Sequence, residues 1–260
     1  WFFFDKTYVC LGTNISSRMK NQVLTTVNQC LLNGEVTVSD ADGIHPQEQG
    51  SRMKKEVRWV VHDKVGYYFL KKENVILSNQ RIEGSWKIAN RQTTTPTDII
   101  RQDVFTLSVD HGRSPNNGDY AYMVIPSADP LSIEKQVEEE GVVILANCPE
   151  VQAVRHDGLN MAYAAFYKGG TLRVHDKIVV EMDSPGMLMM KYNDAGEILA
   201  LGVSDPTRFM KKLHLSVNQK IVGSAQENIQ IEWNEKQALT RIAVDLPQNE
   251  YAGKSVIYNK

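Results

Sequence analysis

The amino-acid sequence predicts an all-β protein of the sandwich type. Apolar and polar residues alternate with period two from one end of the 260-residue chain to the other, which is typical of strands that bury one face. Turn-forming sequences rich in Gly, Asn, Asp and Pro interrupt this alternation at the frequent spacing of an all-β sandwich. Only one segment has the features of a credible helix.

Half-buried strands are predicted wherever the alternation is regular. Their apolar positions are Phe105, Leu107 and Val109; Leu213, Leu215 and Val217; Ile229, Ile231 and Trp233; and Ile242, Val244 and Leu246. Other stretches are apolar at successive positions, so we expect strands covered on both faces. These stretches are Val57–Val61, Tyr120–Ile125 and Met187–Met190.

The single helix is predicted at Pro130–Glu139. Asp129 is a favourable N-cap, and proline suits the first helical position. The helix runs into three consecutive acidic residues and Gly141, after which a strand-like run begins at Val142. Charged links that contain glycine are common domain boundaries, so we expect one domain over residues 1–141 and a second over residues 142–260.

Two polar stretches, Ser39–Lys55 and Asn90–Gln102, are predicted to be long loops, and long loops of β proteins often carry sites. The chain opens with four aromatic residues, Trp1–Phe4, and has neither the basic region nor the cleavage site of a signal peptide. Four exposed aromatic side chains would be costly. We therefore expect this segment to lie inside a sheet of a longer protein.

Composition narrows the classes of function. Lys plus Arg number 29 and Asp plus Glu number 31, so the net charge of −2 offers no basic excess for general nucleic-acid binding. No apolar run approaches the roughly 18 residues of a membrane span. Neither nucleic acid nor a membrane is an expected partner. The three cysteines are too few for a disulfide scaffold, although one bridge between Cys10 and Cys30 is conceivable.

No catalytic or cofactor motif stands out. The sequence lacks Gly-x-Ser-x-Gly, a phosphate-binding glycine loop and His-Glu-x-x-His. Asp40-Ala41-Asp42-Gly43 resembles the start of a calcium loop, but Ser51 stands where such a loop needs a glutamate. A hydrated turn is the better interpretation, and we expect no metal and no cofactor.

The histidines and tryptophans leave few candidates. His62-Asp63-Lys64 and His175-Asp176-Lys177 are expected to be charged hairpin turns, and His111 a hydrogen-bonded turn residue that could in principle serve as an acid or base. No two of the six histidines have metal-ligand spacing; the others are His45, His156 and His214. Trp59 is expected in the core.

The roles of Trp86 and Trp233 are less certain, because an aromatic ring can stack against a sugar as well as against core side chains. Core packing is favoured for both residues. No residue is assigned as catalytic or metal-binding, and substrate-binding residues remain unknown. From its residues alone, the chain is an all-β fragment without a visible catalytic set.

An ordered series of segments adds a family resemblance. The series is Trp1–Lys6, Val9–Ile15, Thr25–Gln29, Trp59–Phe69, Val109–Gly112, Pro115, Tyr120–Pro126, Ile144–Asn147 and Val151–Val154. Together these segments resemble the C-terminal β portion of the family 8 polysaccharide lyases, which include chondroitin AC, hyaluronate and xanthan lyases. The first segment is most similar to the chondroitin AC lyases.

The resemblance implies an architecture and a reaction. It implies the later part of a large antiparallel β super-sandwich up to about Gly141, followed by a small C-terminal β-sandwich. Enzymes of this family cleave uronic-acid polysaccharides by β-elimination, with general acid–base catalysis and stabilisation of an enolate-like charge. Their catalytic Asn, His, Tyr and Arg lie on an N-terminal helical toroid, and a supporting Glu lies upstream of the Trp-Phe-Phe-Phe segment. The resemblance therefore assigns no catalytic residue within Trp1–Lys260.

We therefore expect the β portion of an extracellular or periplasmic chondroitin-type lyase, which buttresses the catalytic toroid and forms part of the glycan cleft. The expected partners are an acidic polysaccharide of the chondroitin or hyaluronan class and an N-terminal helical domain of the same protein. The alternative is a stand-alone, non-catalytic carbohydrate-binding or adhesive β-sandwich protein. A hydrolase with its site in the long loops is a third reading, which the sparse acids near strand ends disfavour.

Overall fold

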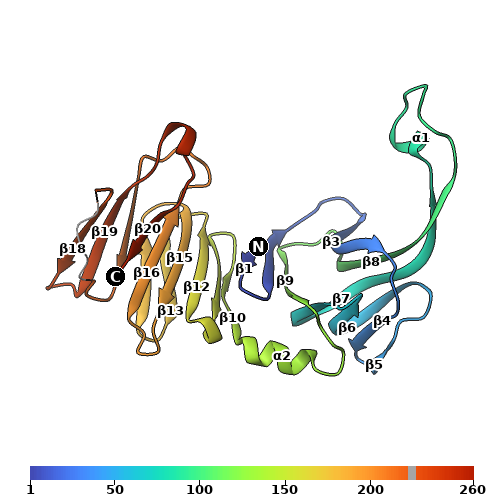
Figure 1. The fold of residues 1–260 in the computed structure, drawn as a ribbon, viewed down its shortest axis with the longest axis horizontal. Helices are drawn as coiled ribbons and strands as arrows, with labels where there is room; N and C mark the ends of the chain where they lie inside the picture. Colours follow the sequence, from blue (N-terminus) through green and yellow to red (C-terminus); the bar gives the residue numbers. More distant parts are fainter. Residues whose placement is uncertain (222–226) are drawn as a thin grey trace. The chain divides into compact units, whose positions relative to one another are not determined.

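A computed structural model describes residues 1–221 and 227–260 and confirms the all-β fold (Figure 1). The chain folds into two compact units, one of Phe3–Ile133 together with Trp1, the other of Glu134–Lys260 together with Phe2. Apart from the short first strand, the strand pairings among the described residues are antiparallel. No described helix is long and apolar enough to cross a membrane.

One large sheet forms the first unit. Its described strands are β1 (Phe2–Phe3), β2 (Tyr8–Ile15), β3 (Gln22–Leu31), β4 (Val36–Asp40), β5 (Gly43–Pro46), β6 (Gly50–His62), β7 (Val65–Gly84), β8 (Ile100–Arg113) and β9 (Gly118–Pro126). They pair in the order β1-β2-β9-β7-β6-β4-β5, and β3 pairs with β8, which pairs with β7.

The long strand β7 divides this sheet into two layers. Its first residues, Val65–Phe69, pair with β9, whereas Val75–Gly84 pair with β8. The neighbouring strand β6 is irregular at the same level, where its register with β7 shifts between Lys54 and Val57. An irregular ladder bends a strand and increases its twist. The two halves of the sheet therefore fold over one another and enclose a core.

Apolar residues from both layers fill this core. Phe105 of β8 and Phe69 of β7 are fully buried. The Phe105 ring stacks on the imidazole of His62 at a centroid distance of 4.3 Å and lies 6.0 Å from the Tyr67 ring. Trp59 is also fully buried, which confirms its expected place in the core. Val57–Val61 and Tyr120–Ile125 are buried at most successive positions, as the sequence predicts.

Of the two long loops predicted in this unit, the first is wrong and the second is correct for most of its length. Ser39–Lys55 contains the end of β4, the whole of β5 and the start of β6. The sheet edge explains the error, because β5 exposes most of its residues and therefore shows no apolar alternation. In Asn90–Gln102 the irregular backbone ends earlier than expected, since β8 begins at Ile100.

Strands β7 and β8 extend past their other partners as a two-stranded arm, which projects at the upper right of Figure 1. The arm comprises residues 81–103. At its tip lies α1 (Trp86–Ala89), a one-turn helix that the sequence analysis did not predict. The Ser85 hydroxyl accepts a hydrogen bond from the Lys87 N–H at 3.3 Å and caps this turn.

The predicted helix is α2 (Ile133–Glu140), which begins three residues later than expected. Asp129 caps the preceding turn, because its carboxylate accepts a hydrogen bond from the Leu131 N–H at 3.0 Å. The Ile133 N–H then bonds to the Asp129 carbonyl at 2.9 Å. The division between the two compact units falls within this helix.

The second unit is a sandwich of two sheets. The first has the order β10-β11-β12-β15-β16-β20 and consists of β10 (Val142–Asn147), β11 (Val151–His156), β12 (Met161–Phe166), β15 (Gly186–Tyr192), β16 (Ile198–Ser204) and β20 (Val256–Asn259). The second has the order β13-β14-β17-β19-β18 and consists of β13 (Gly170–His175), β14 (Ile178–Met182), β17 (Lys212–Val217), β19 (Leu239–Asp245) and β18 (Ile229–Asn234). The short 3-10 helices η1 (Asp157–Leu159) and η2 (Asn249–Tyr251) lie in connecting segments.

Alternating residues of both sheets form one core in this unit. Leu213, Leu215 and Val217 of β17 are buried, as their alternation predicts. The expectation for Met187–Met190 is wrong, because Met187 is exposed whereas Leu188 and Met190 are buried. This strand has one solvent-facing side, on which Met189 is half-buried.

Candidate functional site

His62 is a structural residue at the end of β6. Its Nε2 accepts a hydrogen bond from the Asn33 N–H at 3.0 Å, so the neutral ring carries its proton on Nδ1, which lies 3.7 Å from the Cys30 sulfur. Burial lowers the pKa of this imidazole. The expected hairpin turn is present, because Asp63 and Lys64 join β6 to β7 with positive φ. Both nitrogens of His62 serve the fold.

His111 lies on β8 rather than in a turn. Its Nε2 is 2.8 Å from the Thr25 hydroxyl of the neighbouring strand β3. Burial lowers the pKa of the imidazole, although the Asp110 and Asp119 carboxylates oppose this effect. The contact gives His111 a cross-strand structural role.

The candidate calcium loop is the turn between β4 and β5. Asp40 Oδ1 accepts a hydrogen bond from the Asp42 N–H at 3.0 Å and lies 3.1 Å from His45 Nε2, while Lys54 Nζ is 3.3 Å from Oδ2. Burial raises the pKa of this carboxyl, but its hydrogen bonds and the Lys54 charge outweigh burial and lower it. The carboxylate is thus held by the protein's own donors. Among the described residues, no three His, Cys, Asp or Glu side chains are grouped to hold a metal ion.

The remaining histidines lie apart from one another in the second unit. His156 is buried on β11, with Nε2 2.7 Å from Glu140 of α2. His175 ends β13, and its Nδ1 accepts a hydrogen bond from the Lys177 N–H at 3.4 Å, so the second expected hairpin is also present.

The cysteines form no disulfide. Cys10, Cys30 and Cys148 are all free thiols, so the conceivable Cys10–Cys30 bridge is absent. Cys10 is buried on β2, where burial raises the pKa of its thiol.

Two tryptophans differ from Trp59 in their surroundings. Trp233 is half-buried on β18, with Lys220 Nζ 5.9 Å from its ring. The expectation that Trp86 packs in the core is wrong, because this residue is 62% exposed at the tip of the arm. The arm has just two strands and no opposing layer within the first unit, so its apolar side chains stay partly exposed.

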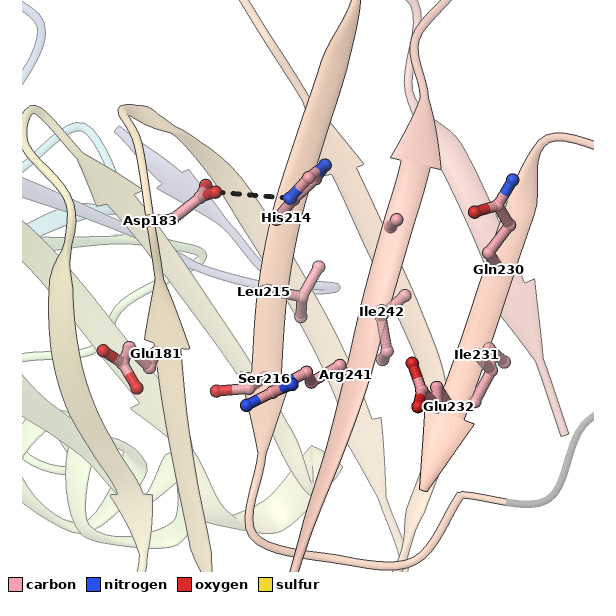
Figure 2. A pocket seen from close by; sticks show the side chains of 11 residues that line it. Glu181, Asp183, His214, Leu215, Ser216, Gln230, Ile231, Glu232, Arg241 and Ile242 are labelled. Atoms are coloured by element: carbon pink, nitrogen blue, oxygen red, sulfur yellow. Dashed lines mark ion pairs between the residues drawn. The ribbon is translucent and has the colours of Figure 1, made fainter. Parts of the chain in front are cut away.

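A groove lies on the outer face of the second sheet of the sandwich (Figure 2). It encloses about 420 Å³ over β14, β17, β19 and β18. Its lining residues are Glu181, Asp183, His214, Leu215, Ser216, Gln230, Ile231, Glu232, Arg241, Ile242 and Ala243. Alternation along each strand turns the charged members outward, away from the core.

Cross-strand register sets the order of the groove's polar side chains. Glu181 is opposite Ser216, Ser216 is opposite Arg241, and Arg241 is opposite Glu232. Beside this row, Asp183 Oδ2 lies 3.5 Å from His214 Nδ1. The sequence analysis missed the groove because its residues come from four separated segments. The predicted alternation of β17 and β18, which places His214 and Ser216 on one polar face and Gln230 and Glu232 on another, indicated part of it.

The charges of the groove determine which ligands it can bind. Three carboxylates (Glu181, Asp183 and Glu232) face the single guanidinium of Arg241. Such a surface repels a polyanion and provides hydrogen bonds to neutral or cationic groups. It is also a poor nucleophilic site, because His214 and Ser216 stand two residues apart along one strand, about 7 Å between their backbones.

Family models cover most of the chain. Residues 1–137 match the super-sandwich domain of polysaccharide lyase family 8, and residues 143–214 match the C-terminal β-sandwich domain of the same family. The chain belongs to polysaccharide lyase family 8. The family resemblance inferred from the ordered segments is thereby confirmed, as is the super-sandwich followed by a C-terminal β-sandwich.

Individual relatives in the family include three enzymes. The chain is 33% identical over 256 residues to chondroitinase-AC of Pedobacter heparinus, which covers 98% of this chain and 34% of that protein. It is 26% identical over 219 residues to xanthan lyase of Bacillus sp., which covers 80% of this chain and 23% of that protein. Hyaluronate lyase of Thermasporomyces composti is 28% identical over 261 residues, covering 97% of this chain and 32% of that protein.

Solved structures of lyases superpose on this chain over nearly its whole length. A chondroitinase AC lyase structure superposes with a TM-score of 0.82 at 34% identity, covering 99% of this chain and 35% of that one. A xanthan lyase structure from Paenibacillus has a TM-score of 0.84 at 24% identity, covering 99% and 25%. The chain thus spans about a third or less of the length of the family members that it matches.

Proposed function

We propose that this chain is the β portion of a lyase that cleaves uronic-acid glycosaminoglycans of the chondroitin type by β-elimination. The observation that carries the proposal is its 33% identity to chondroitinase-AC across 98% of its length. The β portion buttresses a catalytic helical domain and forms part of the wall of the glycan cleft. Because polymers of this size do not cross membranes, the enzyme works outside the cell or in the periplasm.

The chemistry supports a catalytic site outside the described residues. β-Elimination needs a cation or hydrogen-bond donors that neutralise the uronate, a base for the C5 proton and an acid for the leaving oxygen. His62 and His111 are committed to structural contacts in the first unit. The groove of the second unit has an acidic surplus, which opposes uronate binding. Within residues 1–221 and 227–260, these candidates do not combine into such a set.

A direct test compares the full-length protein with the 260-residue chain. Each is incubated with chondroitin, hyaluronan and xanthan, and the ultraviolet absorbance of the unsaturated uronate product is followed. We expect cleavage of chondroitin by the full-length protein and none by the 260-residue chain. Full-length protein that binds these polymers without cleaving them would instead support the non-catalytic carbohydrate-binding protein.

The placement of the catalytic site is tested in the same assay. Steady cleavage by the 260-residue chain, abolished by His62→Ala or His111→Ala, would show that the structural assignment of these histidines is wrong. Retained cleavage by full-length His111→Ala protein is the expected result.

A further inference from the structure

Two loops lie side by side at one end of the second unit. The first, residues 205–211, joins β16 to β17, and the second, residues 246–255, joins β19 to β20 and contains η2, the short red helix in Figure 1. The register places them together, because Lys212 at the start of β17 is opposite Asp245 at the end of β19. Both loops lie entirely within the described residues.

A buried carboxylate fixes the shape of the first loop. Asp205 is 3% exposed, and its two oxygens accept hydrogen bonds from the Thr207 N–H at 2.8 Å, the Thr207 hydroxyl at 2.6 Å, the Phe209 N–H at 2.9 Å and the Met210 N–H at 2.8 Å. Burial raises the pKa of this carboxyl, but these donors outweigh burial and lower it. The Asp205 carboxylate is thus buried in the loop, and both of its oxygens accept hydrogen bonds.

Further hydrogen bonds tie the two loops together. The Leu246 N–H donates to the Lys211 carbonyl at 2.8 Å, and the Gln248 side-chain amide donates to the Met210 carbonyl at 3.1 Å. The Arg208 guanidinium donates to the Asn249 carbonyl at 3.5 Å. The loops therefore form one supported platform, and their exposed side chains are presented in defined positions.

Two aromatic rings stand in solvent on this platform. Phe209 is 89% exposed and Tyr251 is 60% exposed, although both belong to loops with many internal hydrogen bonds. The ammonium of Lys254 lies 6.0 Å from the Tyr251 ring. An exposed ring on a supported loop offers an apolar face to a flat ligand, and the C–H face of a pyranose is such a ligand.

The charge around the rings is positive. The exposed cations are Arg208, Lys211 and Lys254, and the exposed acid of the platform is Glu250. Lys212 adds little, since it pairs with Asp245 at 3.2 Å. This local surplus of cations stands in a chain whose net charge is −2 and contrasts with the acidic surplus of the groove.

We propose that this platform, formed by Arg208, Phe209, Lys211, Tyr251 and Lys254, is a non-catalytic binding site for an acidic polysaccharide. Sugar rings stack on Phe209 and Tyr251, while uronate or sulfate groups pair with the three cations. The site holds the polymer near the enzyme between cleavage events. The choice of an acidic polysaccharide as the ligand rests on the proposed function, whereas the platform itself is independent of catalysis.

Affinity electrophoresis of the 260-residue chain through gels that contain chondroitin sulfate, hyaluronan or neutral dextran tests the site. We expect retardation by the two acidic polymers and none by dextran. The double variant Phe209→Ala/Tyr251→Ala should bind about tenfold more weakly, since two lost stacking contacts amount to about that factor. Lys211→Gln/Lys254→Gln should weaken binding and flatten its dependence on salt.

Two controls match these changes. Trp86→Ala removes from the first unit a ring about as exposed as that of Tyr251, and Lys236→Gln removes a cation from the turn at the opposite end of β19. Both variants should bind like the parent chain. Circular dichroism confirms that each variant is folded. Unchanged binding by the aromatic double variant overturns the proposal, as does tighter binding to anionic lipid vesicles than to either acidic polymer.

A second readout separates this inference from the proposed function. In the full-length enzyme, the platform variants should raise the KM for long chondroitin chains and leave the kcat/KM for short oligosaccharides unchanged. A folded full-length protein without lyase activity, combined with polysaccharide binding that depends on Phe209 and Tyr251, would refute the lyase proposal and keep the binding site. An active enzyme whose KM for long chondroitin chains is unchanged in the platform variants would support the lyase proposal and refute the binding site.

Discussion

Replacement of Phe105 by alanine tests the packing of the first unit. The ring is fully buried, stacks on His62 at 4.3 Å and lies 6.0 Å from the ring of Tyr67. Removal of a buried Phe ring costs about 3–5 kcal/mol, because apolar transfer energy is lost and a cavity remains. A unit of this size has a total stability of about 5–15 kcal/mol, so the variant loses a large fraction of it.

The assay is urea unfolding of the 260-residue chain, followed by circular dichroism. With a dependence of about 2 kcal/mol per molar urea, a loss of about 4 kcal/mol lowers the midpoint of the first unit by about 2 M. Trp86→Ala is the matched control, because this aromatic residue is mostly exposed and its removal should cost no more than about 0.5 kcal/mol. Equal midpoints for the Phe105→Ala and Trp86→Ala variants would refute the assignment of the core.

Three other perturbations have defined outcomes. Burial lowers the pKa of His62, so the unfolded chain binds its proton more readily; the stability of the first unit should fall as the pH drops below about 6.5, and urea midpoints at pH 7.5 and 5.5 should differ less in a His62→Gln variant. Gly66→Ala should lower the thermal midpoint of the first unit by the equivalent of about 1–3 kcal/mol, since the added carbon would lie 2.7 Å from Ile133 and 2.8 Å from Ala128; an unchanged midpoint would mean that this contact yields freely. Asp205→Ala should cost the second unit about 2 kcal/mol and speed amide exchange at Phe209, with exchange rates at parent level as the contrary result.

The strands with one buried face were predictable because burying one face requires apolar and polar residues to alternate along the sequence. Leu213, Leu215 and Val217 alternate with polar residues, and the structure buries all three. The edge strand β5 shows no such alternation, because it exposes most of its residues and is held in place by its pairing with β4. Helix α2 was found through Asp129, but the first turn after this cap is not α-helical, so its start was misplaced by three residues.

The exposed surfaces were harder to predict than the core. Trp86 looks like a core residue in isolation, and only the length of β7 and β8 places it at the tip of an arm. The groove depends on the register of four strands, and register comes from pairing across the sheet rather than from local preference. The platform loops depend on Asp205, whose role becomes visible only when its four hydrogen bonds are known.

The pairing of β2 with β9 has a consequence for synthesis of the chain. Cys10 lies opposite Tyr122, so the first long strand finds its long partner among the described strands at the far end of the unit's sequence. On the ribosome, β2 emerges early and, of the described strands, has just the two-residue β1 as a partner until β9 has been translated, whereas the local hairpins β6–β7 and β7–β8 can close sooner. Nascent chains that stop short of Gly118 therefore expose one edge of an apolar strand to chaperones and to one another. Slower translation after β9 would give this long-range pair time to form before the C-terminal sandwich follows.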